Sequence, residues 1–426
     1  MGSTTLSSSG KMIKEAPNTR RTLVFCISSY KGVNTGVGGH YRSVREIADM
    51  LQPEFDVRVL TFGNLPSPVL ADKPYYRHVP AGSSANPLTW VRLRRARKAL
   101  DLDSPEGVLY LTVGHLPAYI PVLLCMAPGS GPVAHVKPGG PSFPRSYIYN
   151  GIPMMVFSRQ DYELFAGHDD RRPLMVAPGR VSKPPYDPQY LKQAVPQFLG
   201  AKDRLRLLTV CRVAREKEAS IRMMYGALEN VRGDLVSIHI GIPQSPGLLK
   251  ELERMPLPFA HHLAVTDQAV DTAARAIHEC DLFIGLGRSA IEAMALGKIP
   301  FVPVNDHQGK PRLVAVTADN WRVFDIYNFT DRTPISELEQ AGQVVTIEEV
   351  VSDYQRWGCL GDELHEIYEN HLSVQSSAVI WRSFCDNAFR HKTARHLDIA
   401  RFFYYLLFLG KRKIEEVRPH PLGNRK

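Results

Sequence analysis

The chain has few of the features that would place it in a membrane or in an oxidising compartment. Its six cysteines include no Cys-x-x-Cys pair, which argues against a disulfide framework or a zinc site. No apolar run approaches the roughly 20 residues needed to cross a bilayer. Residues 1–20 are rich in Ser and Thr and lack the apolar core of a secretory signal, so we expect a flexible tail there. These absences predict a cytoplasmic protein.

Basic charge is concentrated at the C-terminus. The formal net charge is +9, and residues 386–426 hold ten Lys or Arg against four Asp or Glu. An aromatic run, Phe402–Leu409, precedes Lys411, Arg412 and Lys413 there. Two interpretations are open: a C-terminal helix that packs its aromatic side chains on the protein, or peripheral docking on the anionic inner face of a membrane. No recognisable nucleic-acid-binding module accompanies this charge, so nucleic acid is not an expected partner.

Apolar strands and amphipathic helices alternate along the chain, as in doubly wound α/β domains. At 426 residues the chain is long enough for two such domains. In the first half the predicted strands are 22–28, 57–61, 108–113 and 154–158, and the predicted helices are 41–51 and 92–100. In the second half the predicted strands are 206–211, 235–240, 282–285 and 299–304, and the predicted helices are near 217–230, 267–279 and 289–296.

This alternation lapses around residues 183–203, where prolines and polar residues indicate an exposed connection. Two doubly wound domains leave a cleft between them, and ligands of such sheets bind at the carboxyl ends of the strands. The expected organisation is a Rossmann-like domain at 21–185, a linker at 186–204, a second Rossmann-like domain at 205–385, and a C-terminal helix and basic tail at 386–426.

The strongest local signal is the segment Asp-Leu-Phe-Ile-Gly-Leu-Gly-Arg-Ser-Ala-Ile-Glu-Ala-Met-Ala, which begins at Asp281. It predicts a strand, a tight turn at Gly287 and a short helix with Ser289 as N-cap. Backbone N–H groups at the start of that helix, beside Arg288, suit a bound phosphate. Glu292 has two interpretations: a capping-box partner of Ser289, or a carboxylate that accepts hydrogen bonds from a ribose.

A second signal is a group of cations directly after an apolar strand. Leu207–Cys211 leads into Arg212, and the following loop carries Lys217. Cations at this position would stabilise the charge that a diphosphate leaving group gains as a glycosidic bond breaks. The alternative is a surface loop in which the cations pair with Glu216 and Glu218.

Further candidates lie near strand ends in the first half. A glycine-rich loop before the first helix would let backbone approach a bound phosphate or an acceptor. A single histidine is more often structural, but a place at a strand end favours contact with substrate. The candidates are Gly38 and Gly39 for the donor, and His40, His115, Lys137 and Gly139 for the acceptor or the transferred sugar.

Together these motifs resemble the large family of retaining GT-B glycosyltransferases that build bacterial polysaccharides and glycolipids from nucleotide sugars (glycosyl transferases group 1, family 4-like). That family pairs an N-terminal Gly-Gly loop, here Gly38 and Gly39, with a later strand that ends in Arg before a Glu-Lys step. Here these residues are Arg212 and Glu216–Lys217. Its Glu-Ala-Met-Ala-x-Gly segment here begins at Glu292. The likeness covers residues 22–305.

The resemblance implies a GT-B fold, in which two Rossmann-like domains face a central cleft. It also implies transfer of a sugar from a nucleotide-diphosphate donor to a saccharide or lipid-linked saccharide acceptor, with retention and without a metal or other cofactor. Arg212 and Lys217 would bind the diphosphate, Glu292 the ribose, and His115 would lie near the transferred sugar. The remaining donor-binding candidates are Gly38, Gly39, Gly287, Arg288 and Ser289.

One departure concerns the loop that contacts the transferred sugar. The family has an earlier Glu, with seven residues between it and the second; here that position is Ile284 and the loop is shorter. Two alternatives therefore stay open: a nucleotide-sugar epimerase of the same fold and a non-catalytic sugar-nucleotide-binding relative. An oxidoreductase is disfavoured because the glycine loop lacks a G-x-G-x-x-G followed by a ribose-binding acid. The sequence does not define the nucleotide base, the sugar or the acceptor.

Overall fold

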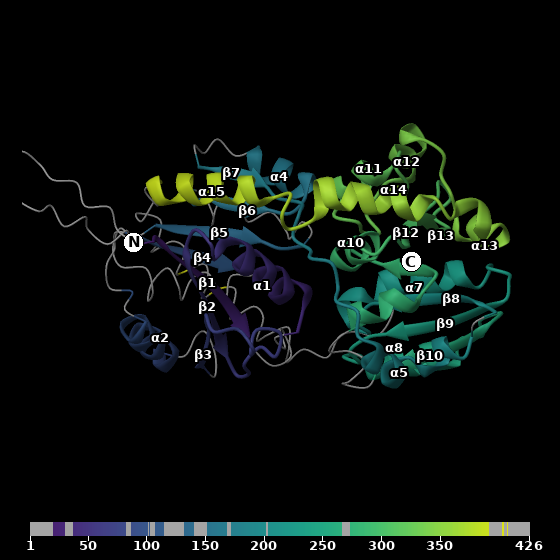
Figure 1. Ribbon diagram of the computed structural model, residues 1–426, viewed down its shortest axis with the longest axis horizontal. Coiled ribbons are helices and arrows are strands. Elements are labelled where there is room, and N and C mark those ends of the chain that lie inside the picture. Colours follow the sequence, from purple (N-terminus) through teal and green to yellow (C-terminus); the bar gives the residue numbers. More distant parts are fainter. Residues whose placement is uncertain are drawn as a thin grey trace, which may run out of the picture.

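The computed structural model contains two α/β domains that lie side by side (Figure 1). Residues 1–19 of the expected tail, the candidate His115, and the segment 402–413 apart from Phe403 and Leu407 lie outside the residues that the structure describes. The described residues are 20–29, 37–81, 87–100, 102, 107–114, 132–139, 151–167, 172–201, 203–265, 273–391, 403 and 407.

The first sheet contains seven strands, all paired in parallel, in the order β3-β2-β1-β4-β5-β6-β7. Strand β1, which lies between β2 and β4 in the interior of the sheet, is buried from Leu23 to Ile27, because helices cover both faces of a parallel sheet. The strands are β1 (Thr22–Ser29), β2 (Asp56–Gly63), β3 (Tyr76–Pro80), β4 (Val108–Val113), β5 (Val133–Lys137), β6 (Met154–Val156) and β7 (Leu174–Val176). The helices are α1 (Gly39–Leu51), α2 (Pro87–Ala99) and α4 (Arg159–Ala166).

The second sheet contains six strands in the order β10-β9-β8-β11-β12-β13. Strands β12 and β13 pair antiparallel, and the other described pairs are parallel. The strands are β8 (Leu205–Val210), β9 (Leu235–Ile240), β10 (Ala260–Ala264), β11 (Leu282–Gly285), β12 (Ile299–Asn305) and β13 (Pro311–Ala315). The helices beside this sheet are α5 (Pro188–Ala194), α6 (Pro196–Leu199), η3 (Arg215–Lys217), α7 (Glu218–Leu228), α8 (Pro246–Arg254), η4 (Ala273–Glu279) and α10 (Arg288–Met294).

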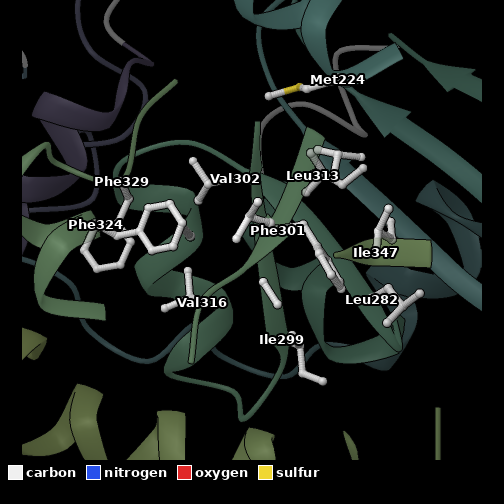
Figure 2. Close-up of a cluster of buried hydrophobic side chains, with 14 of the residues drawn as sticks. Met224, Leu282, Ile299, Phe301, Val302, Leu313, Val316, Phe324, Phe329 and Ile347 are labelled. Carbon is white, nitrogen blue, oxygen red and sulfur yellow. The ribbon is translucent and has the colours of Figure 1, made fainter. Parts of the chain in front are cut away.

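The remaining helices form a C-terminal layer that ends on the first domain (Figure 1). They are α11 (Trp321–Ile326), α12 (Ile335–Ala341), α13 (Ile347–Ser352), η5 (Tyr354–Trp357), α14 (Leu360–Ile367), η6 (Tyr368–Leu372) and α15 (Ala378–Arg390). Figure 2 shows the core of the second domain, where Phe301 of β12 lies among apolar side chains from the sheet and the helices. Phe324 and Phe329 stack there, with ring centroids 6.3 Å apart. This core holds the strands whose ends face the cleft.

Helix α15 belongs to the first domain's core, which differs from the expected domain boundary at residue 385. Trp381 is fully buried and its ring lies 6.4 Å from that of Phe25 in β1. The polypeptide returns toward the first domain at Val374, whose N–H donates to the Val181 carbonyl (2.9 Å). The predicted boundary at residue 385 differs from the structure because the apolar face of α15 packs in the core of the first domain. Within the described residues no helix is both long and apolar enough to span a membrane.

The predicted strands of both halves are confirmed, with bounds shifted by a few residues. The helix predicted at 289–296 is observed at Arg288–Met294, and the helix predicted at 92–100 is observed at Pro87–Ala99. The prediction near 267–279 falls on described residues only from Ala273, which begins the 3₁₀ helix η4. The doubly wound α/β class is correct for both domains.

Candidate active site

A cleft with a volume of ≈ 1030 Å³ separates the two domains at the carboxyl ends of their parallel strands. Ser28 and Val113 line it from β1 and β4 of the first sheet, and Val210 and Ile240 line it from β8 and β9 of the second. Ligands of doubly wound sheets bind at this end of the strands. The cleft is therefore the candidate active site.

Nearly all predicted site residues line this one cleft, although they come from both domains and from distant parts of the sequence. His115 lies outside the described residues, so its position is not tested. The predicted residues that line the cleft are Gly38, Gly39, His40, Lys137, Gly139, Arg212, Lys217, Gly287, Arg288, Ser289 and Glu292. The fold thus brings them together, and their individual roles stay predictions.

Arg212 and Lys217 are held at the end of β8 by the turn that leads into α7. Arg212 pairs with Glu216 at 3.3 Å, but both side chains are more than a third exposed, so this pair contributes little stability. Lys217 forms no ion pair with any described residue. Glu218 pairs instead with Arg222, so the interpretation of this loop as a fully paired charge cluster is only partly correct. Both cations are available to a ligand in the cleft.

A buried chain of hydrogen bonds supports the backbone just before Arg212. His239 Nε2 donates to the Cys211 carbonyl (2.8 Å), so its Nδ1 must accept from the Tyr225 hydroxyl (2.9 Å). That hydroxyl in turn accepts from His261 Nε2 (2.9 Å). Burial lowers the pKa of His239 and of His261 to about 4, so both rings are neutral at pH 7. This chain of hydrogen bonds fixes the backbone at the end of β8, just before Arg212.

The start of α10 differs from the predicted capping box. Gly287, with φ 58°, is the N-cap, and its N–H donates to the Phe329 carbonyl (2.7 Å). The Ser289 hydroxyl bonds the backbone of Leu286 on both sides, accepting from its N–H and donating to its carbonyl (3.1 Å each). Ser289 therefore stabilises the turn before the helix, and the capping box with Glu292 is wrong.

Arg288 joins the two domains at the edge of the cleft. Its Nε donates to Glu292 Oε1 (2.8 Å), and its other nitrogens bind Glu46 and Ser43 of α1 and the Arg180 carbonyl (3.1 Å to Ser43, 2.8 Å to the carbonyl). Burial raises the pKa of Glu46, while the positive charge of Arg288 opposes that shift. Arg288 thus connects the two domains and holds the Glu292 carboxylate in place, and its predicted part in donor binding stays a prediction.

A second group of charges lies where Lys137 ends β5. Burial lowers the pKa of Lys137 and raises that of Asp161, and the opposite charge of each partner counteracts the shift. Arg332 acts electrostatically on both residues from the turn after α11, and it lines the cleft with Lys137. Asp331 also lines the cleft and acts on Arg332, so this side of the cleft carries two cations and two anions.

Arg180 completes this wall of the cleft. Its guanidinium binds the Asn328 side chain and lies 5.1 Å from the Phe157 ring centroid. Burial lowers its pKa to about 10, and burial raises the pKa of Asp325, its electrostatic partner, to about 6. Asn328 and Phe329 have φ 57° and φ 51°, a left-handed backbone that Asn tolerates but that is costly for a bulky residue such as Phe329, and such conformations concentrate at functional sites.

Sequence reasoning missed Glu46, Asp161, Arg180 and Arg332 as site residues. A single arginine in a loop carries no sequence signal of the residues that it contacts in the fold. Within the described residues, no cluster of three or more His, Cys, Asp or Glu side chains is placed to hold a metal ion.

Comparison with known proteins gives structural likeness without sequence likeness. No family model and no curated protein matches the sequence. The solved structures that match include Anabaena Alr3699/HepE in complex with UDP and glucose, at a TM-score of 0.58 and 13% identity over 86% of this chain and 99% of that chain. The same protein in complex with UDP-glucose gives a TM-score of 0.56 at 14% identity, over 85% of this chain and 99% of that chain.

An E. coli trehalose-6-phosphate protein bound with UDP-2-fluoro glucose matches at a TM-score of 0.50 and 11% identity, over 86% of this chain and 99% of that chain. These matches span both domains and nearly the whole of each solved chain. At such low identity they establish the architecture and not the reaction. The chain therefore has the GT-B fold, two Rossmann-like domains that face a central cleft.

Proposed function

We propose that the protein transfers a sugar from a nucleotide-diphosphate donor to a saccharide or lipid-linked saccharide acceptor. The observation that carries this proposal is the convergence of predicted residues in one interdomain cleft. Arg212 and Lys217 approach from the end of β8, and Glu292 approaches from α10. A cationic strand end beside a fixed carboxylate suits a nucleotide diphosphate, because the phosphates need cations and the ribose hydroxyls need an acceptor.

In this proposal Arg212 and Lys217 bind the diphosphate and stabilise the charge that it gains as the glycosidic bond breaks. These cations take the role that a metal ion has in other transferases, so we propose a metal-independent reaction. Glu292 accepts hydrogen bonds from the ribose, and the Gly38–Gly39 backbone approaches the phosphates from the first domain. His115 would contact the transferred sugar, and the retention of configuration is likewise part of the proposal.

We propose UDP as the nucleotide, because the matching solved structures of Anabaena Alr3699/HepE hold UDP or UDP-glucose. His40, Lys137 and Gly139 line the first-domain side of the cleft, where we place the acceptor. We place the reaction in the cytoplasm, because the cysteines of the sequence form no Cys-x-x-Cys pair. The basic C-terminal segment would make a peripheral contact with the inner face of the membrane.

One observation favours binding without transfer. Ile284, which replaces the family's first glutamate, is fully buried in β11, so no side chain at this position reaches the transferred sugar. Arg288, the nearest cation on the following helix, is bound to Glu46 and Glu292. A non-catalytic sugar-nucleotide-binding protein is therefore the second candidate, and it shares the donor site but not the turnover.

Calorimetric titration with UDP, GDP, ADP and dTDP tests the donor site. We expect one nucleotide to bind selectively, and we expect the Arg212→Ala, Lys217→Ala double variant to lose that binding because it removes both diphosphate contacts. The control is Arg204→Ala, Lys250→Ala, which removes the same charge from exposed positions outside the cleft. Equal loss in the control, or no binding of any nucleotide to the native chain, contradicts the proposed site.

Turnover separates the two candidate functions. With the nucleotide sugar that binds, release of free nucleotide in the presence of saccharide acceptors supports the transferase. Loss of one positioned cation typically slows such a step by about 100- to 1000-fold, so Lys217→Ala should show that loss. Selective nucleotide binding without any release of nucleotide would assign the non-catalytic function. Glu292→Gln should weaken nucleotide binding more than it changes the rate at saturation.

A further inference from the structure

Helix α2 is strongly basic and has no part in the cleft. It carries five Lys or Arg residues and no acid: Arg92, Arg94, Arg95, Arg97 and Lys98. None of its residues lines the candidate active site, and Figure 1 shows it beside β3, on the far side of the first domain from the second. Arg94, Arg95 and Lys98 are exposed and form no ion pair within the part of the chain that the structure describes.

The outward face of α2 also presents large apolar side chains. Leu88 is 62% exposed and Val91 is 46% exposed, whereas Leu93 on the opposite face is fully buried. Helical spacing places Leu88, Val91, Arg95 and Lys98 on one face. This face combines an apolar centre with flanking cations, which is the composition of segments that lie at a lipid–water interface.

A second cavity extends this basic surface. Its volume is ≈ 830 Å³, and it is bordered by the end of α2 and lined by Arg20, Arg58 and Arg77. Asp56 also lines it, but Arg58 binds that carboxylate at 2.8 Å. Arg20 and Arg77 form no ion pair with a described carboxylate. The cavity is therefore positively charged, and it is large enough for anionic headgroups.

We propose that the outward face of α2, together with this arginine-lined cavity, docks the first domain on the surface of an anionic lipid bilayer. Leu88 and Val91 enter the headgroup region, and Arg94, Arg95 and Lys98 bind lipid phosphates. The apolar pair favours a bilayer over nucleic acid, which would use the cations but not the exposed aliphatic side chains. Because α2 lies away from the cleft, docking leaves the cleft open. The inference goes beyond sugar transfer and does not require the cleft to be catalytic.

Vesicle sedimentation of the full chain tests this surface. The probes are vesicles of phosphatidylcholine alone and vesicles that also contain phosphatidylserine. We expect binding only to the anionic vesicles, with loss at high salt because screening weakens the attraction. Each cation near such a surface strengthens binding by about fivefold, so Arg94→Gln, Arg95→Gln, Lys98→Gln should weaken it by about 100-fold. Leu88→Ser, Val91→Ser should weaken it by about tenfold through lost apolar contact.

A matched control keeps the test specific. Lys192→Gln, Lys250→Gln, Arg254→Gln removes the same charge from exposed positions of α5 and α8 in the second domain, and it should change binding by less than about twofold, since these charges lie far from the docked face. Circular dichroism melting checks that all variants fold.

A third charge variant, Lys411→Gln, Arg412→Gln, Lys413→Gln, measures the C-terminal segment separately. The proposal is overturned if the α2 charge variant binds anionic vesicles like the native chain, or if only the C-terminal variant loses binding. It is also overturned if the native chain does not bind anionic vesicles but binds single-stranded DNA, and if Leu88→Ser, Val91→Ser leaves that DNA binding unchanged.

Discussion

Replacing Arg288 by alanine removes the guanidinium that connects α10 of the second domain to α1 of the first. The native side chain is only 11% exposed, and its two carboxylate partners, Glu46 and Glu292, are 17% and 6% exposed. The variant also loses the bonds to the Ser43 hydroxyl (3.1 Å) and to the Arg180 carbonyl (2.8 Å). Two buried carboxylates are then left without their cation.

The expected cost follows from this burial. Removal of one partner from a buried ion pair lowers the free energy of unfolding by about 3–5 kcal/mol, because an uncompensated charge stays behind. Arg222→Ala is the matched control, since Arg222 also binds two carboxylates, Glu218 and Glu251, but on the surface with 48% of its side chain exposed. Exposed pairs contribute about 0–1 kcal/mol, so the control should change stability little.

The pH dependence gives a second readout. Burial already raises the pKa of Glu46 in the folded protein, and loss of Arg288 raises it further. A carboxyl group with a raised folded pKa contributes stability at low pH, and that contribution is lost as the pH rises through the folded pKa. Arg288→Ala should therefore destabilise the protein more at pH 7 than at pH 5.

Urea denaturation followed by tryptophan fluorescence at the two pH values measures the effect. A loss of about 3 kcal/mol or more at pH 7, with a smaller loss at pH 5, supports the buried pair. The reasoning is refuted if Arg288→Ala costs no more than Arg222→Ala, or if its cost is the same at both pH values.

Two further predictions concern the connection between the domains and the support of Arg212. Gly179→Ala would place its Cβ 2.1 Å from the Ser373 carbonyl, so we expect a loss of about 1–3 kcal/mol by urea denaturation, whereas Gly247→Ala, with open space around its Cβ, should be nearly neutral. Tyr225→Phe leaves ring nitrogens of His239 and His261 without their partner and should cost about 1–3 kcal/mol; an unchanged unfolding midpoint would contradict the hydrogen-bond chain.

The fold was readable from sequence where strands are buried on both faces. The run at 22–28 is continuous and apolar because β1 is central in its sheet, and 282–285 is apolar for the same reason in β11. Edge strands carry a weaker pattern. Strand β3 (Tyr-Arg-His-Val-Pro) and strand β10 (Ala-His-His-Leu-Ala) interrupt the apolar run with polar residues, because one side of each lacks a neighbouring strand.

The site was readable where candidate residues lie at strand ends or in the turns and first helical residues that follow them. Arg212 and Lys137 were found because the carboxyl ends of parallel strands converge at one edge of a sheet. Arg180 and Arg332 lie in loops between elements, and the approach of Arg332 to Asp161 depends on the packing of the second domain against the first. No local pattern encodes such a contact, so these residues required the structure.

Glu292 shows why a correct residue can carry a wrong local explanation. Its spacing from Ser289 matches a capping box, and that motif needs only one turn of helix. In the structure the Glu292 carboxylate instead accepts a hydrogen bond from Arg288, which also binds Glu46 across the domain boundary. The capping box does not form because the Glu292 carboxylate pairs with the buried Arg288 guanidinium, and loss of that pair would leave a buried charge uncompensated. Glu292 therefore couples the proposed ribose contact to the arrangement of the domains. A nucleotide that binds Glu292 would change its bond to Arg288 and, through Arg288, the contact between the two domains.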